Sequence, residues 1–114
     1  MPFRDNSDHL NDILQAIDLI NTFLEGVTFE SYQDDLKTKS AVERQLQIVT
    51  EAAYRLGDDA EKIAPGPDWA NIRGMGNILR HAYHRINDRF IWVAVKDDLP
   101  AMREVILKAL SSES

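Results

Sequence analysis

Residues 73–87 of the chain read RGMGNILRHAYHRIN, and they combine basic and amide side chains at helical spacing. On a helical wheel at about 100° per residue, one set of these side chains falls within an arc of roughly 100°. The set is Arg73, Asn77, Arg80, His81 and His84. Arginine binds phosphate oxygens through paired N–H donors, and histidine transfers protons near neutral pH. The spacing therefore predicts a phosphodiester site on one face of a helix.

The charge of the chain is unevenly distributed. The formal net charge is −6, yet the segment from Trp69 to Trp92 holds four arginines and one aspartate, which leaves −9 for the remainder. Such an acidic protein is unsuited to coating nucleic acid, but an anionic ligand would find one favourable place to dock. From charge alone, a solvated helix face or a set of salt bridges is the better explanation of the cluster.

A metal centre is the weaker hypothesis for the same helix. His81, His84 and Asp88 form the pattern H-x-x-H-x-x-x-D, which can gather metal ligands on one helical face. Nearby arginines would repel a cation, so neither a metal nor another cofactor is expected. The chain has no cysteine, which excludes a disulfide framework and a thiolate metal site.

The first half of the chain is predicted to contain two long amphipathic helices and two short helical pieces. Apolar residues recur at helical spacing over 10–24 and 42–56, and short pieces are predicted over 29–34 and 58–64. The predicted caps and stops are Ser7, Gly26, Thr28 and Gly57. We find no strand-period alternation and no internal repeat.

The second half is predicted to begin after the break at 65–67, Pro-Gly-Pro. Asp68 is the expected N-cap of a helix over 69–85 that carries the polar stripe, and Asn87 caps a helix over 88–97. Pro100 fits the first turn of a last helix. On the helix over 69–85 the side opposite the stripe is expected to pack in the core through Met75, Ile78, Leu79 and Ala82.

Long helices with short connections predict an all-α, up-and-down antiparallel bundle of four main helices plus short pieces. Residues 1–114 form one domain, with flexible ends at about 1–7 and 111–114. The longest unbroken apolar run is the six residues Phe90–Val95, far short of a membrane span. We expect a cytoplasmic protein with no membrane partner.

Three segments of the chain carry a resemblance to a known family. They are AVERQLQIVTEAAYRL at 41–56, PDWANIRGMGNILRHAYHRIN at 67–87 and FIWVAVKDDLP at 90–100. In these segments the chain resembles the HepT-like (DUF86) branch of the HEPN superfamily. The resemblance implies an HEPN-like helical bundle that forms a homodimer, with active sites facing each other across the interface.

The resemblance also implies a function. It indicates a metal-independent RNA endonuclease that acts as the toxin of a type VII-like toxin–antitoxin system and cuts tRNA or mRNA. The partner implied is a minimal nucleotidyltransferase antitoxin that silences the toxin by attaching AMP to a tyrosine. A catalytically inactive HEPN-fold module, which pairs with a nucleotidyltransferase or with RNA, stays as the alternative.

Site residues follow from the family motif, which is arginine, asparagine, a few residues, histidine, one residue and tyrosine. Asn77, His81 and Tyr83 match the motif, so the resemblance implies His81 as the catalytic histidine and Tyr83 as the AMPylated residue. The position of the motif arginine holds Gly76. Two arginines of the stripe are candidates to replace it, namely Arg80 and Arg73. The residues expected to bind substrate are His84 and Arg85.

Overall fold

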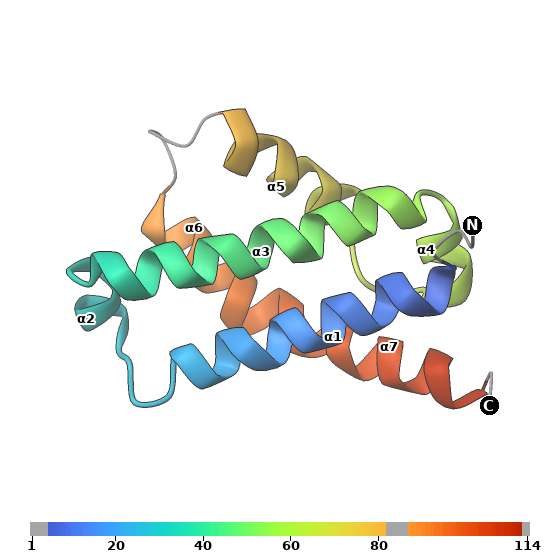
Figure 1. Cartoon of the computed structure of the whole chain (residues 1–114), viewed down its shortest axis with the longest axis horizontal. Helices are drawn as coiled ribbons and strands as arrows, with labels where there is room; N and C mark the ends of the chain where they lie inside the picture. Colours follow the sequence, from blue (N-terminus) through green and yellow to red (C-terminus); the bar gives the residue numbers. More distant parts are fainter. Residues whose placement is uncertain (1–4, 82–86, 113–114) are drawn as a thin grey trace.

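The computed structural model describes residues 5–81 and 87–112, and all regular elements in these ranges are helices (Figure 1). The order is α1 (Asn6–Phe23), α2 (Phe29–Gln33), α3 (Leu36–Leu56), α4 (Asp59–Ile63), α5 (Trp69–His81), α6 (Asp88–Val93), η2 (Ala94–Asp98) and α7 (Leu99–Ser112). Helices α1, α3 and α5 and the final α6–η2–α7 rod alternate in direction (Figure 1). The predicted antiparallel, all-α bundle is confirmed.

Most of the predicted caps are confirmed. Thr28 forms a capping box with Ser31 at α2, and Gly57 ends α3 with a positive φ of 56°. The carboxylate of Asp68 accepts from the backbone N–H of Asn71 at 3.0 Å, at the start of α5. Asn87 likewise accepts from the first N–H groups of α6. Short polar side chains satisfy helix N–H groups that have no carbonyl partner, so these residues set where the helices begin.

The prediction that Ser7 caps the first helix is wrong. Asp5 is the N-cap of α1, because its carboxylate accepts from the N–H of Asp8 at 3.0 Å. The hydroxyl of Ser7 donates to that carboxylate at 2.7 Å and supports the cap from inside the helix. At the other end α1 stops at Phe23, three residues before the predicted stop at Gly26.

The last two predicted helices are one rod. The sequence places a boundary near Asp97, but α6 passes into α7 through η2, a π-helical turn, with no non-helical residue between them. Pro100 is the second residue of α7, which directly follows η2, so the new helix that the sequence predicts does not begin there. Inside a continuous rod a proline cannot donate to the carbonyl of the preceding turn. The helical assignment also reaches Asn6 and Ser112, inside the ends that the sequence marks as flexible.

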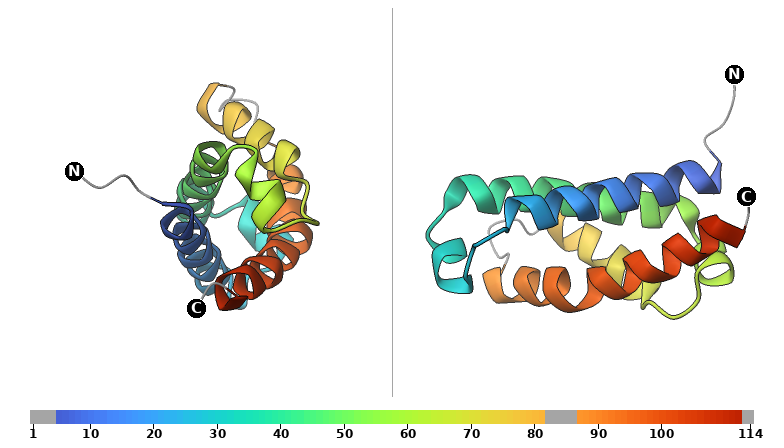
Figure 2. Two further views of the ribbon diagram at one scale, coloured as in Figure 1. Left: turned by 90° about the vertical axis from the view of Figure 1, so that its right-hand side faces the viewer. Right: turned by 90° about the horizontal axis from the view of Figure 1, so that it is seen from below.

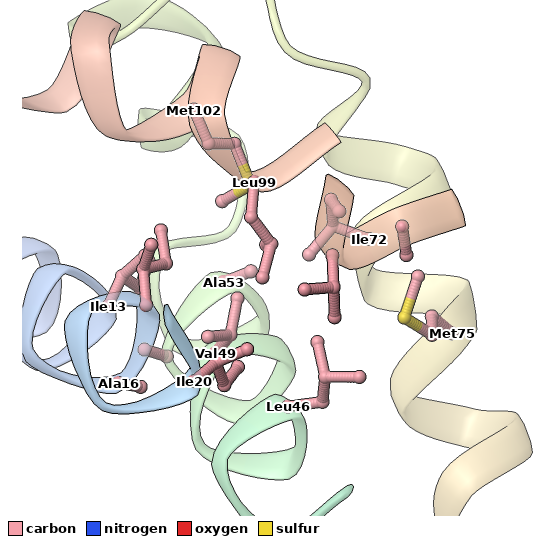
Figure 3. Close-up of a cluster of buried hydrophobic side chains, with 14 of the residues drawn as sticks. Ile13, Ala16, Ile20, Leu46, Val49, Ala53, Ile72, Met75, Leu99 and Met102 are labelled. Atoms are coloured by element: carbon pink, nitrogen blue, oxygen red, sulfur yellow. The ribbon is translucent and has the colours of Figure 1, made fainter. Parts of the chain in front are cut away.

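The core lies where α1, α3, α5 and α7 meet (Figure 3). Ile13 and Ile20 of α1 face Val49 of α3 across it, and Met102 of α7 closes the remaining side (Figure 3). All of these side chains are buried at the positions that the helical periodicity predicts. None of the described helices has both the length and the apolar character that crossing a bilayer requires.

Helix α5 lies at the edge of the bundle and packs chiefly on α3 (Figure 2). Its start is fixed by Trp69, which is buried and donates from its indole N–H to the carbonyl of Ala64 at 2.8 Å. Met75 and Leu79 are buried as predicted. Ile78 is 40% exposed, so its assignment to the core is wrong. The reason is that a helix at the edge of a bundle buries a narrower stripe than a central helix does.

Gly76 allows α5 and α3 to approach closely. A Cβ at this position would lie 2.7 Å from the hydroxyl oxygen of Thr50 and 2.8 Å from its Cβ. Thr50 is buried, and its hydroxyl donates to the carbonyl of Gln47 at 3.0 Å, so it belongs to the body of α3. By contrast, a Cβ on Gly74 would meet nothing within 4 Å. The two glycines therefore have different roles in one helix.

This difference predicts opposite effects on stability. Gly76→Ala is expected to lower the free energy of unfolding by about 1–3 kcal/mol, because the added methyl group overlaps Thr50. Gly74→Ala is the matched control and is expected to raise it by about 0.5–1 kcal/mol, because alanine restricts the unfolded chain. Urea denaturation followed by circular dichroism measures both changes. Stabilisation by both substitutions would show that α3 and α5 are not in contact at Gly76.

Candidate active site on helix α5

The first arginine of the stripe is held by a carboxylate. The guanidinium of Arg73 donates to both oxygens of Glu61, at 3.3 and 2.8 Å, and to the carbonyl of Gly57 at 3.2 Å. The hydrogen bond from Arg73 holds the pKa of Glu61 below its usual value, and the same bond raises the pKa of Arg73. This contact joins α5 to α4. The assignment of Arg73 to a phosphate stays a prediction, and it requires the guanidinium to leave Glu61.

The second arginine has a different environment. Within residues 5–81 and 87–112, Arg80 forms no ion pair and no hydrogen bond. One of its terminal nitrogens, Nη1, lies 3.3 Å from the point where a Cβ of Gly76 would stand. Side chains on an α-helix point back toward its N-terminus, so a residue covers the surface one turn before it. Arg80 therefore lies over the notch that Gly76 leaves, four positions earlier.

Asn77 and His81 are also exposed and lie on the same side of α5 as Arg80. His81 directly follows Arg80, and Asn77 directly follows Gly76. Asn77, Arg80 and His81 therefore all belong to the last turn of α5. Arg73 is eight residues before His81, a rise of about 12 Å along the helix axis. Asn77, Arg80 and His81 are thus exposed within about 100° of one another around the end of α5, whereas Arg73 is held by Glu61 further toward its start.

The remaining predicted residues Tyr83, His84 and Arg85 lie outside the described residues. Beyond them, Asp88 pairs with the ammonium of Lys39 at 3.2 Å. The fourth arginine of the basic segment, Arg89, lies over the ring of Phe29, 4.3 Å from its centroid. Among the described residues, no three histidine, aspartate or glutamate side chains are grouped as metal ligands.

A hollow of about 410 Å³ lies between α3 and α5, next to Arg80. The residues that line it are Glu51, Tyr54, Arg55 and Arg80. Arg55 donates to Glu51 at 3.0 Å, one helical turn away on α3. The sequence analysis did not single out these α3 residues. The available signal is Tyr54 itself, an aromatic residue beside the buried stripe of α3 rather than in it.

The arrangement suits acid–base chemistry on an anion. A guanidinium with no protein partner can take phosphate oxygens as acceptors, and an exposed imidazole beside it can accept or donate a proton. The amide of Asn77 adds a donor and an acceptor on the same helical face. His81 follows Arg80 in the chain and points about 100° further around the helix, so an anion that contacts both side chains must lie over the end of α5.

The sequence matches one family along most of its length. A family model described as "Ribonuclease HepT-like" matches residues 13–109. A protein named "Probable ribonuclease HepT" from Thermococcus cleftensis is 36% identical over 100 residues, covering 88% of this chain and 91% of that protein.

Two further relatives are named as RNases. One from Methanocaldococcus jannaschii is 33% identical over 100 residues, covering 88% of this chain and 83% of its own. One from Caldanaerobacter subterraneus is 28% identical over 105 residues, covering 92% of this chain and 94% of that protein. No solved structure matches the chain significantly.

Proposed function

This chain belongs to the ribonuclease HepT-like family, and on that premise we propose that it is an RNA endonuclease that works without a metal ion. The observation that carries the proposal is the pair of exposed basic side chains at the end of α5. Arg80 and His81 are consecutive exposed residues at the end of α5, and in the described ranges neither is bound to a carboxylate. A phosphodiester supplies the negative charge that this pair lacks.

In the reaction, the 2′-hydroxyl of a ribose attacks the adjacent phosphorus atom. A bond forms from the 2′-oxygen to phosphorus while the bond to the 5′-oxygen of the next nucleotide breaks. The products are a 2′,3′-cyclic phosphate and a 5′-hydroxyl end. One group takes the proton of the 2′-hydroxyl, and another gives a proton to the leaving 5′-oxygen. No group outside the protein and the RNA is needed.

The residues divide this work. His81 acts as general base or general acid, and His84 takes the complementary role. Arg80 binds the phosphate and stabilises the charge that increases in the transition state, and Asn77 orients the attacked group. Arg85 binds the flanking RNA, and Arg73 contributes only if it exchanges Glu61 for phosphate. Flexible single-stranded RNA is preferred, because in-line attack requires the backbone to turn.

The wider role proposed is that of a toxin in a toxin–antitoxin pair in the cytoplasm. The partner is a minimal nucleotidyltransferase that transfers AMP to Tyr83, two residues after His81. AMP on this tyrosine would add one phosphate group and one adenosine beside the site. The added negative charge would compete with RNA for the basic side chains.

A homodimer is also part of the proposal. The outward face of α5, which α3 does not cover, exposes small residues and one isoleucine, namely Ala70, Gly74 and Ile78. Small residues allow a second helix to approach closely. A second copy packed on this face would place two His81 side chains near the same seam.

A second candidate function rests on Gly76, which stands where the family motif has arginine. In that case the protein binds RNA or the nucleotidyltransferase without cutting RNA. The discriminating experiment incubates the purified full chain with end-labelled single-stranded RNA in excess EDTA. Cleavage that leaves cyclic phosphate ends is the expected result. Cleavage that EDTA abolishes would contradict the metal-independent mechanism, and intact RNA with retained binding would favour the silent module.

A further inference from the structure

The hollow between α3 and α5 has a feature that the proposed cleavage chemistry does not use. Tyr54 is 69% exposed, which makes it the most exposed aromatic residue in the described part of the chain. Within those ranges its ring and its hydroxyl have no hydrogen-bond, ring or cation partner. Exposing most of a tyrosine ring to water forgoes the stabilisation that burial would give. Packing among the described residues therefore does not explain its position.

The surroundings of Tyr54 are cationic on balance. Arg55 and Arg80 line the same hollow, and the single carboxylate there, from Glu51, is already paired with Arg55 at 3.0 Å. Among the described residues that line the hollow, Arg80 is therefore the uncompensated charge. A π-face next to two guanidiniums is the combination that holds single-stranded nucleic acid, in which a base stacks on the ring and the backbone meets the cations.

The hollow is also correctly placed relative to His81. Helices α3 and α5 are antiparallel and touch at Thr50 and Gly76, so Tyr54 lies toward the start of α5. The side chain of Arg80 points in that direction as well, because it folds back over Gly76. His81 is five residues beyond Gly76, a rise of about 7.5 Å with a turn of about 140° around the helix, and it directly follows Arg80, which lines the hollow. A strand cut beside His81 would extend along Arg80 toward Tyr54.

We infer that the hollow between α3 and α5 binds one nucleotide of single-stranded RNA next to the cleaved bond. Tyr54 stacks on the base, and Arg80 and Arg55 contact the flanking phosphates. The inference rests on the proposed function for its ligand and adds a binding subsite to it. Since every base has a π-face, this subsite selects unpaired nucleotides and not a particular sequence.

Binding is measured separately from cleavage to test this inference. The full chain with His81→Ala is titrated into a short, fluorescein-labelled, single-stranded RNA, and anisotropy gives Kd. Adding Tyr54→Ala is expected to weaken binding by about 5- to 150-fold, the effect of losing one base–aromatic stack. Tyr54→Phe keeps the ring and is expected to bind as the His81→Ala background does. Leu36→Ala, another exposed apolar residue on α3, is the matched control and leaves Kd unchanged.

The cations of the hollow have their own test. The double variant Glu51→Gln with Arg55→Gln keeps the net charge of the protein but removes the guanidinium. It is expected to make the negative slope of log K against log salt less steep by about 0.7, the value for one phosphate contact on single-stranded nucleic acid. An unchanged slope would remove Arg55 from the subsite.

Three results would overturn the inference. Tyr54→Ala could bind RNA as tightly as the background, or Tyr54→Phe could bind as weakly as Tyr54→Ala. Alternatively, Tyr54→Ala could convert a dimer into a monomer in light scattering, which would assign the ring to an interface between copies. The failure of the proposed function is distinguishable. A wild-type chain that binds RNA in a Tyr54-dependent way but never cuts it would keep the subsite and refute the endonuclease.

Discussion

Replacing His81 with alanine is expected to reduce RNA cleavage by about 10²- to 10⁴-fold, the usual contribution of a general acid or base. His81 is exposed at the end of α5, so the substitution removes an imidazole without opening the core. Single-turnover cleavage of labelled RNA in EDTA measures the effect. The melting temperature of the variant should equal that of the wild type, which separates lost chemistry from lost folding.

Free imidazole provides the control for the His81 variant. If His81 transfers a proton, added imidazole should restore part of the rate to His81→Ala and should not accelerate the wild type. Equal cleavage by the wild type and His81→Ala would refute the assignment, and it would assign any observed activity to a contaminating ribonuclease.

Replacing Arg80 with alanine is the second large effect, with an expected loss of about 10²- to 10³-fold in rate, as for removal of one donor to a developing oxyanion. Arg80→Lys should recover only part of this loss, because an ammonium keeps the charge but lacks the planar pair of donors. The matched control is Arg44→Ala, an exposed arginine on α3 that lines none of the hollow next to Arg80.

Arg73 supplies the contrast to Arg80. Its guanidinium is held by Glu61 and by the carbonyl of Gly57, so Arg73→Ala is expected to lower stability while the cleavage rate stays near that of the wild type. A large loss of rate with unchanged stability would instead show that Arg73 leaves Glu61 and binds the substrate. The two alanine variants together decide which arginine replaces the one missing at Gly76.

Much of the fold could be predicted because it depends on local chemistry. The capping box of Thr28, the carboxylate of Asp68 and the amide of Asn87 act on N–H groups two or three residues away. The apolar stripes of α1 and α3 have helical spacing, and they are buried. Caps and periodicity are visible in sequence because the interacting residues are neighbours in the chain.

The wrong predictions concern places where the residue that decides the structure is distant in sequence. They also concern places where two nearby residues can form the same local interaction. Both Asp5 and Ser7 can cap α1, and the residue types alone do not choose between them. The exposure of Ile78 depends on how many helices surround α5. A helical wheel shows the residues of one helix and not its neighbours. The π-helical turn η2 changes the hydrogen-bond register but not the residue types, so no composition signal marks it.

The candidate site was predictable in part for the same reason. The polar stripe of α5 follows from helical geometry, and Asn77, Arg80 and His81 are exposed on it as expected. The pairing of Arg73 with Glu61 depends on the path of the chain through α4 and the Pro-Gly-Pro turn, which periodicity does not determine. The contact of Gly76 with Thr50 and the position of Tyr54 likewise require the crossing of α3 and α5.

The π-helical turn has a consequence for how the protein tolerates insertions and deletions. Buried residues advance by four positions twice in succession, at Ile91, Val95 and Leu99, which would drift by about 40° per step on a regular α-helix. The wider turn of η2 takes up this drift. Deleting one residue from η2 would leave an ordinary helix in which Ile91 and Leu99 are seven positions apart, about 20° short of two full turns, so the buried faces of α6 and α7 would stay aligned. A one-residue deletion is therefore tolerated best inside η2, whereas a deletion within α6 or α7 would turn the residues after it by about 100°.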